Sequence, residues 1–153
     1  SLQSINIRNN SKEYLIRNSK NMTLILTKNR KKYWEFIRVL RSNKSVEDGF
    51  IDKVQISKKE QEIYMNKYND NYYVCLNKQI PCGYIGEING DIRLCTSPEF
   101  QGLGVGTFMI KELTKIKKNI FAKIKVENIS SIKAFEKAGY EKKYFLFEPK
   151  KTS

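Results

Sequence analysis

The stretch that decides the fold runs from residue 91 to residue 118 and reads DIRLCTSPEFQGLGVGTFMIKELTKIKK. It opens with a β-prone run and continues through a turn into glycines at alternate positions, Gly102, Gly104 and Gly106. A helical pattern follows, in which apolar residues recur on one face: Val105, Met109, Leu113 and Ile116. A glycine loop between a strand and a helix favours anion binding, because backbone N–H groups can approach phosphate oxygens at the positive end of the helix. We therefore predict that this loop holds a phosphorylated ligand.

Three glycine motifs compete for this loop. A Walker loop requires lysine directly after its last glycine, and Gly106 is followed instead by Thr107. A dinucleotide fingerprint requires a glycine where Thr107 stands, although Glu127 lies at about the distance expected of the ribose-binding acid. The third pattern, Gln/Arg-x-x-Gly-x-Gly/Ala, is met by Gln101, Gly104 and Gly106. By itself this pattern also fits a helix start whose small residues serve only close packing.

A second element lies downstream, where residues 126–131 (VENISS) lead into a short helical pattern that Gly139 closes as a left-handed cap. Together with the glycine loop it resembles the GCN5-related N-acetyltransferase (GNAT) family. That family's pattern is a strand, Pro-x-x-Gln/Arg-x-x-Gly-x-Gly, a helix, a strand, Asn-x-x-Ser/Ala, a short helix and Gly-Phe/Tyr. The matching residues are Thr96, Pro98, Gln101, Gly104, Gly106, Asn128, Ser131, Phe135, Gly139 and Tyr140.

The resemblance implies an α/β (α+β) fold with a single mixed, mostly antiparallel sheet flanked by helices, in the order β-α-α-β-β-β-α-β-α-β. The residue pattern predicts strands at 22–27, 71–76, 82–88, 91–96, 120–126 and 140–147, and helices at about 30–41 and 57–68. We expect one domain over residues 1–153, with residues 1–20 as an N-terminal hairpin or an extension.

Local signals support several of these elements. Ser57 and Glu60 have the spacing of a capping box, and the helix that they open is expected to turn Ile63 and Tyr64 inward. Asn89-Gly90 predicts a tight hairpin, and Asp48-Gly49 predicts another turn. Trp34 is predicted to belong to the core.

Composition limits the class of protein. Hydrophobic residues at 40% and aromatic residues at 12% of 153 residues indicate a folded domain, and no apolar run approaches the ~20 residues that span a bilayer. Cys75, Cys82 and Cys95 are odd in number and lack CxxC spacing, so we expect buried thiols and a cytoplasmic protein rather than a disulfide framework or a zinc site. The absence of histidine excludes His-based triads, and we expect no metal.

The net charge of +13 has two interpretations. A basic nucleic-acid-binding module without catalysis is one of them. The other is a solvated surface that attracts anionic small molecules, which the scatter of lysines along the chain favours.

The resemblance also implies how acetyl-CoA is bound. The backbone of residues 101–107 would bind its pyrophosphate, that is Gln101, Gly102, Leu103, Gly104, Val105, Gly106 and Thr107. Leu94 and Thr96 would pair through their backbones with the pantetheine arm, and the Thr96 N–H would stabilise the oxyanion. Asn128 would hydrogen-bond the cofactor, cap the following helix, or do both, with Ser131 and Phe135 nearby.

Catalysis requires a base for the amine and an acid for the thiolate. Asp91 and Glu87 flank the Asn89-Gly90 turn and are the predicted bases, with Glu99 as a third carboxylate; each is otherwise simply solvated. Many family members have tyrosine where this chain has Phe135, which cannot donate a proton. Tyr140, Tyr144 or water would then supply it.

The acceptor is less defined, because no motif appears in the first 75 residues. We expect direct attack by a primary amine of a small molecule, through a tetrahedral intermediate. The charge favours an anionic acceptor, such as a nucleotide-linked amino sugar. Acetylation of a protein N-terminus or lysine is the alternative, and the enzyme would be a monomer or a homodimer.

Overall fold

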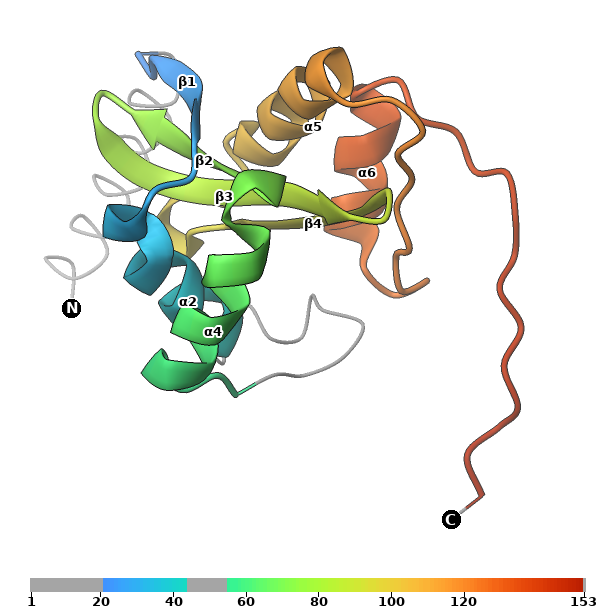
Figure 1. Cartoon of the computed structure of the whole chain (residues 1–153). Coiled ribbons are helices and arrows are strands. Elements are labelled where there is room, and N and C mark those ends of the chain that lie inside the picture. The colour runs from blue at the N-terminus through green and yellow to red at the C-terminus, as the bar shows by residue number, and fades with distance from the viewer. Residues whose placement is uncertain (1–20, 44–54, 153) are drawn as a thin grey trace, which may run out of the picture.

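The computed structural model describes residues 21–43 and 55–152 (Figure 1). Its centre is a four-stranded antiparallel sheet in the order β1-β2-β3-β4. The strands are β1 (Leu24–Lys28), β2 (Tyr72–Asn77), β3 (Ile80–Ile88) and β4 (Asp91–Thr96). The expected hairpin in residues 1–20 and the expected Asp48-Gly49 turn lie outside the described residues.

Two tight turns join the last three strands. Asn89 and Gly90 have φ of 51° and 87°, and they place Ile88 opposite Asp91, as the Asn-Gly signal predicts. Lys78 and Gln79, with φ of 48° and 72°, join β2 to β3 in the same way. Positive φ at both central residues matches the twist of a two-residue hairpin, so these turns fix the register of β2, β3 and β4.

Between β1 and β2 the chain forms helices. A 3₁₀ turn, η1 (Lys31–Tyr33), leads into α2 (Trp34–Ser42), and α4 (Lys58–Tyr68) leads through η2 (Asn69–Asn71) into β2. The predicted capping box is confirmed: Glu60 N donates to Ser57 Oγ over 3.1 Å, and Ser57 N donates to Glu60 Oε2 over 3.0 Å.

The helices cover the two faces of the sheet, with α2 and α4 on one side and α5 (Val105–Ile116) and α6 (Ile129–Lys137) on the other (Figure 1). Strand alternation divides the core accordingly. Tyr72, Val74 and Leu76 of β2 pack with the buried residues of α2 and α4. Cys75 of the same strand packs with Val105 and the other buried residues of α5.

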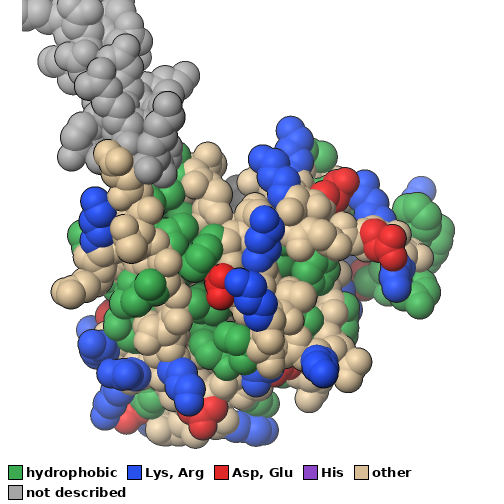
Figure 2. Space-filling model, turned by 90° about the horizontal axis from the view of Figure 1, so that it is seen from above, with side chains coloured by type: hydrophobic (Ala, Val, Ile, Leu, Met, Phe, Trp, Pro, Cys, Tyr) green, Lys and Arg blue, Asp and Glu red, His purple; other side chains and the backbone are tan. Residues whose placement is uncertain are grey.

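The surface and the thiols agree with the interpretation of composition. Figure 2 shows lysine and arginine side chains spread over one face, between hydrophobic and polar groups, rather than gathered in one patch. Cys75, Cys82 and Cys95 are free and buried, and burial raises the pKa of the Cys95 thiol to about 12. In the described part of the chain, no helix has the length and apolar character that a bilayer crossing requires.

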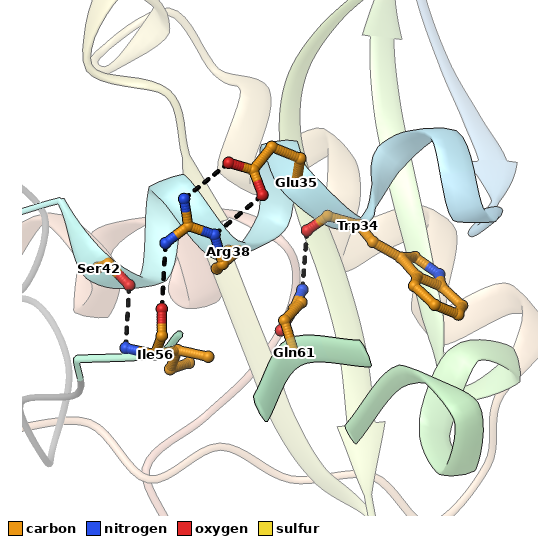
Figure 3. A network of polar contacts seen from close by, with 6 residues as sticks. All are labelled: Trp34, Glu35, Arg38, Ser42, Ile56 and Gln61. Atoms are coloured by element: carbon orange, nitrogen blue, oxygen red, sulfur yellow. Dashed lines mark hydrogen bonds and ion pairs between the residues drawn. The ribbon is translucent and has the colours of Figure 1, made fainter. Parts of the chain in front are cut away.

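A polar network joins α2 to the chain that precedes α4 (Figure 3). Arg38 bonds the Glu35 carboxylate over 2.7 and 2.9 Å and donates to the carbonyl of Ile56 over 3.1 Å. Gln61 donates to the Trp34 carbonyl over 2.8 Å. These contacts fix α2 against α4 at one end of the sheet.

Two side chains predicted to face the core are exposed instead. Ile63 is 64% exposed, because α4 turns Gln61 and Met65 toward the core. Ile116 is 52% exposed, because it is the last residue of α5. Trp34, predicted to be core, is half-buried and donates Nε1–H to Asn69 over 2.8 Å.

The fold class is confirmed, but two predicted strands do not form within the described residues. Residues 120–126 make a single isolated bridge, between Phe121 and Asp91. Of residues 140–147, Tyr140 packs against Phe135, and the rest lie in an exposed segment that runs clear of the body (Figure 1). Both segments have strand-like sequences, but a strand also needs a neighbour along its length.

Candidate active site

The two edges of β4 are occupied differently. One edge pairs with β3 along its whole length. At the other edge, Ile92 N donates to the Phe121 carbonyl over 2.8 Å and Phe121 N donates to the Gly90 carbonyl over 2.9 Å. Beyond Ile92 no described residue pairs with this edge. Because alternate residues direct their backbone groups to the same edge, Leu94 and Thr96 present N–H and C=O groups to open space.

The glycine loop starts where β4 ends. After η3 (Pro98–Phe100), Gly102 and Gly104 have φ of 77° and 87°, a left-handed conformation that residues with a Cβ rarely adopt. Gly104 is the N-cap of α5 and provides no side-chain cap, and the first helical bond runs from Phe108 N to the Gly104 carbonyl over 3.0 Å. The first N–H groups of α5 are therefore available to an anion at the positive end of the helix.

Gly106 brings three elements together. A Cβ at this position would lie 3.8 Å from Thr96 Oγ1, 3.9 Å from Ala134 Cβ and 4.0 Å from Leu94 Cδ1. The missing side chain therefore faces both the open edge of β4 and α6. We call the space bounded by Leu94, Thr96, Gly106 and Ala134 the wedge.

The first turn of α6 is capped by Asn128, whose Oδ1 accepts a hydrogen bond from Ser131 N over 3.2 Å. The capping role that the sequence left open is thus present. Asn128 and Ser131 therefore lie at the start of the helix that also carries Ala134.

A hollow of about 410 Å³ lies on the other side of the sheet, beside α2. Its lining combines the end of α2, the start of β3 and the loop after β4: Phe36, Val39, Leu40, Asn43, Ile80, Pro81, Ser97, Pro98, Glu99 and Phe100. Glu99 is the only charged residue among these. The α2 residues of this hollow were not among the predicted site residues, because their helical spacing indicates only a core-facing stripe.

The sequence of residues 68–142 matches the family model described as Acetyltransferase (GNAT) domain. The chain is a GNAT acetyltransferase. This confirms the predicted family and enzyme class, and with them the predicted acetyl-CoA co-substrate. A comparison with curated proteins finds no match.

Solved structures share the fold of this GNAT acetyltransferase. Spermidine N-acetyltransferase from Vibrio cholerae, in complex with CoA and spermine, has a TM-score of 0.70 at 22% identity, covering 82% of this chain and 85% of that one. A GNAT-family acetyltransferase from Bacillus anthracis has 0.63 at 19%, covering 76% and 78%. Aminoglycoside acetyltransferase AAC(6')-Ib, in complex with coenzyme A and kanamycin, has 0.64 at 15%, covering 79% and 86%.

Phe135, where many relatives have tyrosine, is 4% exposed and belongs to the core between α5 and the sheet. Its ring packs edge-on against Tyr140, with centroids 5.2 Å apart. This burial supports a packing role, and contact with the cofactor remains a prediction.

Tyr140 is engaged at the far end of α5. Its hydroxyl lies 2.7 Å from Thr114 Oγ1, which also donates to the Ile110 carbonyl, so Tyr140 is the donor. Thr114 is nine residues beyond Val105, about 13 Å along the helix from the glycine loop. This arrangement favours a clamp between α5 and α6 over proton donation in the wedge. The other predicted acid, Tyr144, is 92% exposed.

The two carboxylates predicted as bases also have partners. Glu87 Oε2 accepts from Gly90 N over 2.8 Å, and its Oε1 lies 3.8 Å from Lys117 Nζ. Asp91 pairs with Arg93 over 3.3 Å. Both lie at the hairpin that joins β3 to β4, and Asp91 lies about 17 Å along β4 from Thr96. Glu99 is the acidic residue that the structure brings next to the glycine loop and the hollow.

Proposed function

We propose that this GNAT acetyltransferase binds acetyl-CoA in the wedge and transfers the acetyl group to a primary amine of a small molecule. The observation that carries the proposal is the meeting of an unpaired strand edge, an uncapped helix start and a missing side chain at Gly106. These features suit the three parts of the donor, which are an extended amide chain, a pyrophosphate and a thioester.

The residues fit the donor in order. The N–H groups of residues 101–107 would bind the pyrophosphate, since Gly102 and Gly104 allow the backbone to approach closely. The amides of the pantetheine arm would pair with Leu94 and Thr96 as an added strand. Bound acetyl-CoA supplies an activated thioester. The Thr96 N–H would be the donor for the oxygen that becomes negative in the tetrahedral intermediate.

The acceptor amine must be deprotonated before it attacks, because an ammonium has no lone pair and an alkylamine has a pKa of about 10.4. Among the three predicted carboxylates, Glu99 is the base that we propose. Glu87 is held by the hairpin turn and Lys117, and Asp91 is held by Arg93. Glu99 lines the hollow and makes no ion pair with a described residue.

The hollow is an open depression of about 410 Å³ beside the loop that follows β4, and we propose that it takes part of a small acceptor. Its apolar lining and single carboxylate suit an ammonium group carried on a compact skeleton. The net charge of +13 attracts anions over longer distances. A nucleotide-linked amino sugar carries both an amine and negatively charged phosphates, and we propose it as the acceptor class. A polycationic amine is the second candidate, favoured by the Glu99 carboxylate.

Acetyl-CoA reactions with a panel of nucleotide-linked amino sugars, polyamines, aminoglycosides and peptides test this proposal by mass spectrometry. Release of CoA thiol can be followed in parallel, because the three cysteines of the folded protein are buried. We expect acetylation of the amino sugar, with a rate that falls as salt screens the attraction. Acetylation of peptides alone would contradict a small-molecule acceptor, and a preference for polyamines would establish the second candidate.

The substitution Glu99→Gln tests whether Glu99 is the base that deprotonates the acceptor amine. We expect kcat to fall by about 10²–10³-fold, in the range of general-base contributions, while CoA affinity stays unchanged. Asp91→Asn is the matched control, which we expect to retain most of kcat. The opposite pattern would return the role of base to Asp91.

A further inference from the structure

Two arginines that acetyl transfer leaves unexplained lie on the face of the sheet that α2 and α4 cover (Figure 1). Arg41 comes from the last turn of α2, and Arg93 comes from β4. Arg41 makes no ion pair with a described residue, and Arg93 pairs through a single nitrogen with Asp91, over 3.3 Å. Two guanidinium groups beside one carboxylate leave a net positive charge at this place.

The Tyr72 ring lies between the two arginines. Tyr72 of β2 stands opposite Gly86 of β3, which stands opposite Arg93 of β4, and residues in such a row share one face of the sheet. A Cβ at Gly86 would lie 2.5 Å from Tyr72 Cδ1, so the ring leans over β3. Burial raises the pKa of Tyr72, and the charges of Arg41 and Arg93 act in the opposite direction. Both guanidiniums are therefore within electrostatic reach of the Tyr72 hydroxyl.

A pair of hydroxyls adds a hydrogen-bond donor. The hydroxyls of Tyr64, from α4, and Tyr72 lie 2.7 Å apart. Each hydroxyl has one proton, and the bond between the two uses only one of them. The second O–H has no acceptor among the described residues. Because burial raises its pKa, Tyr72 stays protonated at neutral pH, and the pair keeps one proton to donate.

The ring of Tyr64 also positions Arg41. The Arg41 Cζ lies 5.0 Å from the centroid of the Tyr64 ring, and the Arg41 side chain is half-buried. A guanidinium that lies over an aromatic ring keeps its N–H donors in its own plane, where a carboxylate or a phosphate can accept two of them. Arg41 thus presents a fixed pair of donors without a described acceptor.

We propose that Arg41, Arg93 and the hydroxyl pair of Tyr64 and Tyr72 bind a phosphate group of the acetyl acceptor. Phosphate oxygens form short, strong hydrogen bonds with guanidinium groups, and they also accept from hydroxyls. A half-buried setting strengthens these bonds relative to bulk water. Arg41 and the spare hydroxyl proton have no other acceptor among the described residues, so the phosphate displaces no described interaction of either group.

The proposed phosphate site and the acetyl group can be reached by one acceptor. Arg93 directly precedes Leu94, which borders the wedge from the opposite face of the sheet, and the outer edge of β4 between these faces is unpaired beyond Ile92. Arg93 lies ~10 Å along β4 from Thr96, after which the chain enters the loop that carries Glu99. An acceptor with its amine near Glu99 can extend its phosphate to the arginines. The phosphate site rests on the proposed function only for the identity of this ligand.

Inorganic pyrophosphate tests the site without any acetyl transfer. It is titrated calorimetrically into the chain saturated with CoA, whose own pyrophosphate then occupies the glycine loop. We expect Arg41→Gln and Arg93→Gln each to raise the Kd of pyrophosphate by at least ~10-fold, the usual loss for a charge-assisted hydrogen bond, and Tyr64→Phe to raise it ~3-fold. Arg30→Gln removes the same charge from an exposed position before η1 and is the matched control, with a change below about twofold.

Two results of this titration would overturn the proposed phosphate site. One is the absence of pyrophosphate binding by the native chain with CoA. The other is an equal loss in Arg30→Gln and Arg41→Gln, which would show that pyrophosphate responds only to net charge.

Kinetics with two acceptors separate the phosphate site from the proposed function. A nucleotide-linked amino sugar is compared with the same amino sugar free of phosphate. We expect Arg41→Gln to raise KM about 10-fold for the nucleotide-linked sugar alone, with kcat unchanged for both. An equal change in KM for both sugars would overturn the proposed phosphate site. Acetylation of neither sugar, with pyrophosphate binding that still depends on Arg41, would reject the proposed acceptor class and support the phosphate site.

Discussion

The inner edge of β4 is closed and its outer edge is open. The inner edge pairs with β3 from Asp91 to Thr96, and the two strands are buried between helices on both faces. The outer edge is bonded only around Ile92 and then exposes the backbones of Leu94 and Thr96 to the wedge. We therefore expect the same strand to contribute stability along one side and, as proposed, acetyl-CoA binding along the other. Glycines on the two sides allow the difference to be tested.

Replacing Gly106 at the outer edge should have the largest effect. The position has no positive φ, and a Cβ there makes only ordinary contacts at 3.8–4.0 Å, so the fold should tolerate a side chain. The two γ-carbons of valine would enter the wedge. For Gly106→Val we expect acetyl-CoA affinity to fall by at least about 100-fold, or ~2.7 kcal/mol, measured by calorimetric titration. Unchanged affinity in a folded variant would show that the outer edge has no binding role.

Replacing Gly86 of β3, the strand that pairs with the inner edge of β4, should instead weaken the fold. A Cβ at this position would lie 2.5 Å from Tyr72 Cδ1 and 2.6 Å from the Asn71 carbonyl oxygen, and neither backbone nor ring can yield easily. For Gly86→Ala we expect a loss of about 2–3 kcal/mol in the free energy of unfolding, typical of overpacking. Denaturant titration measures this loss. Stability equal to that of the native chain would contradict the close packing of β3 against β2.

The contrast between the edges also explains what the sequence could predict. Turn chemistry and alternation are local, so Asn89-Gly90, the Ser57 capping box and β4 follow from neighbouring residues. Residues 120–126 alternate and residues 140–147 are rich in aromatic residues, so both segments are equally strand-like. Their pairing depends on a neighbour that local pattern does not specify, and the structure leaves them unpaired beyond Phe121 within the described residues.

The site shows the same division. The glycine loop was predictable, because Gly102 and Gly104 occupy left-handed positions that the motif requires. The side-chain partners of Glu87 and Tyr140 were not, since only the folded chain brings Lys117 and Thr114 close to them. The hollow beside α2 likewise joins segments about 40 and 60 residues apart, and no local pattern marks it.

Two helix caps allow the proposed binding region to be compared with a purely structural region. Ser57 caps α4 away from the wedge, and Asn128 caps α6 beside it. We expect Ser57→Ala and Asn128→Ala each to lower the free energy of unfolding by ~1 kcal/mol. Only Asn128→Ala should also weaken acetyl-CoA binding in calorimetric titration. Equal affinity in the two variants would confine Asn128 to its cap.

The smallest effect is expected at Tyr140. Tyr140→Phe removes the bond to Thr114 and should cost about 0.5–1.5 kcal/mol of stability, the usual net value of a hydrogen bond. Because the hydroxyl lies at the far end of α5, we expect kcat to change by less than about twofold, well below a general-acid contribution. A large fall in kcat, together with loss of a descending limb in the pH–rate profile at high pH, would reassign the acid to Tyr140.

The most direct test of the binding role of the outer edge is the thermal unfolding of the native chain with and without CoA or acetyl-CoA. A ligand that binds only the folded state at about 100 times its Kd stabilises that state by ~2.7 kcal/mol. For a chain of 153 residues this corresponds to a rise in Tm of roughly 5–10 °C. We predict a rise of this size with both ligands. No change in Tm at millimolar concentrations of either would contradict the assignment of the wedge as the acetyl-CoA site.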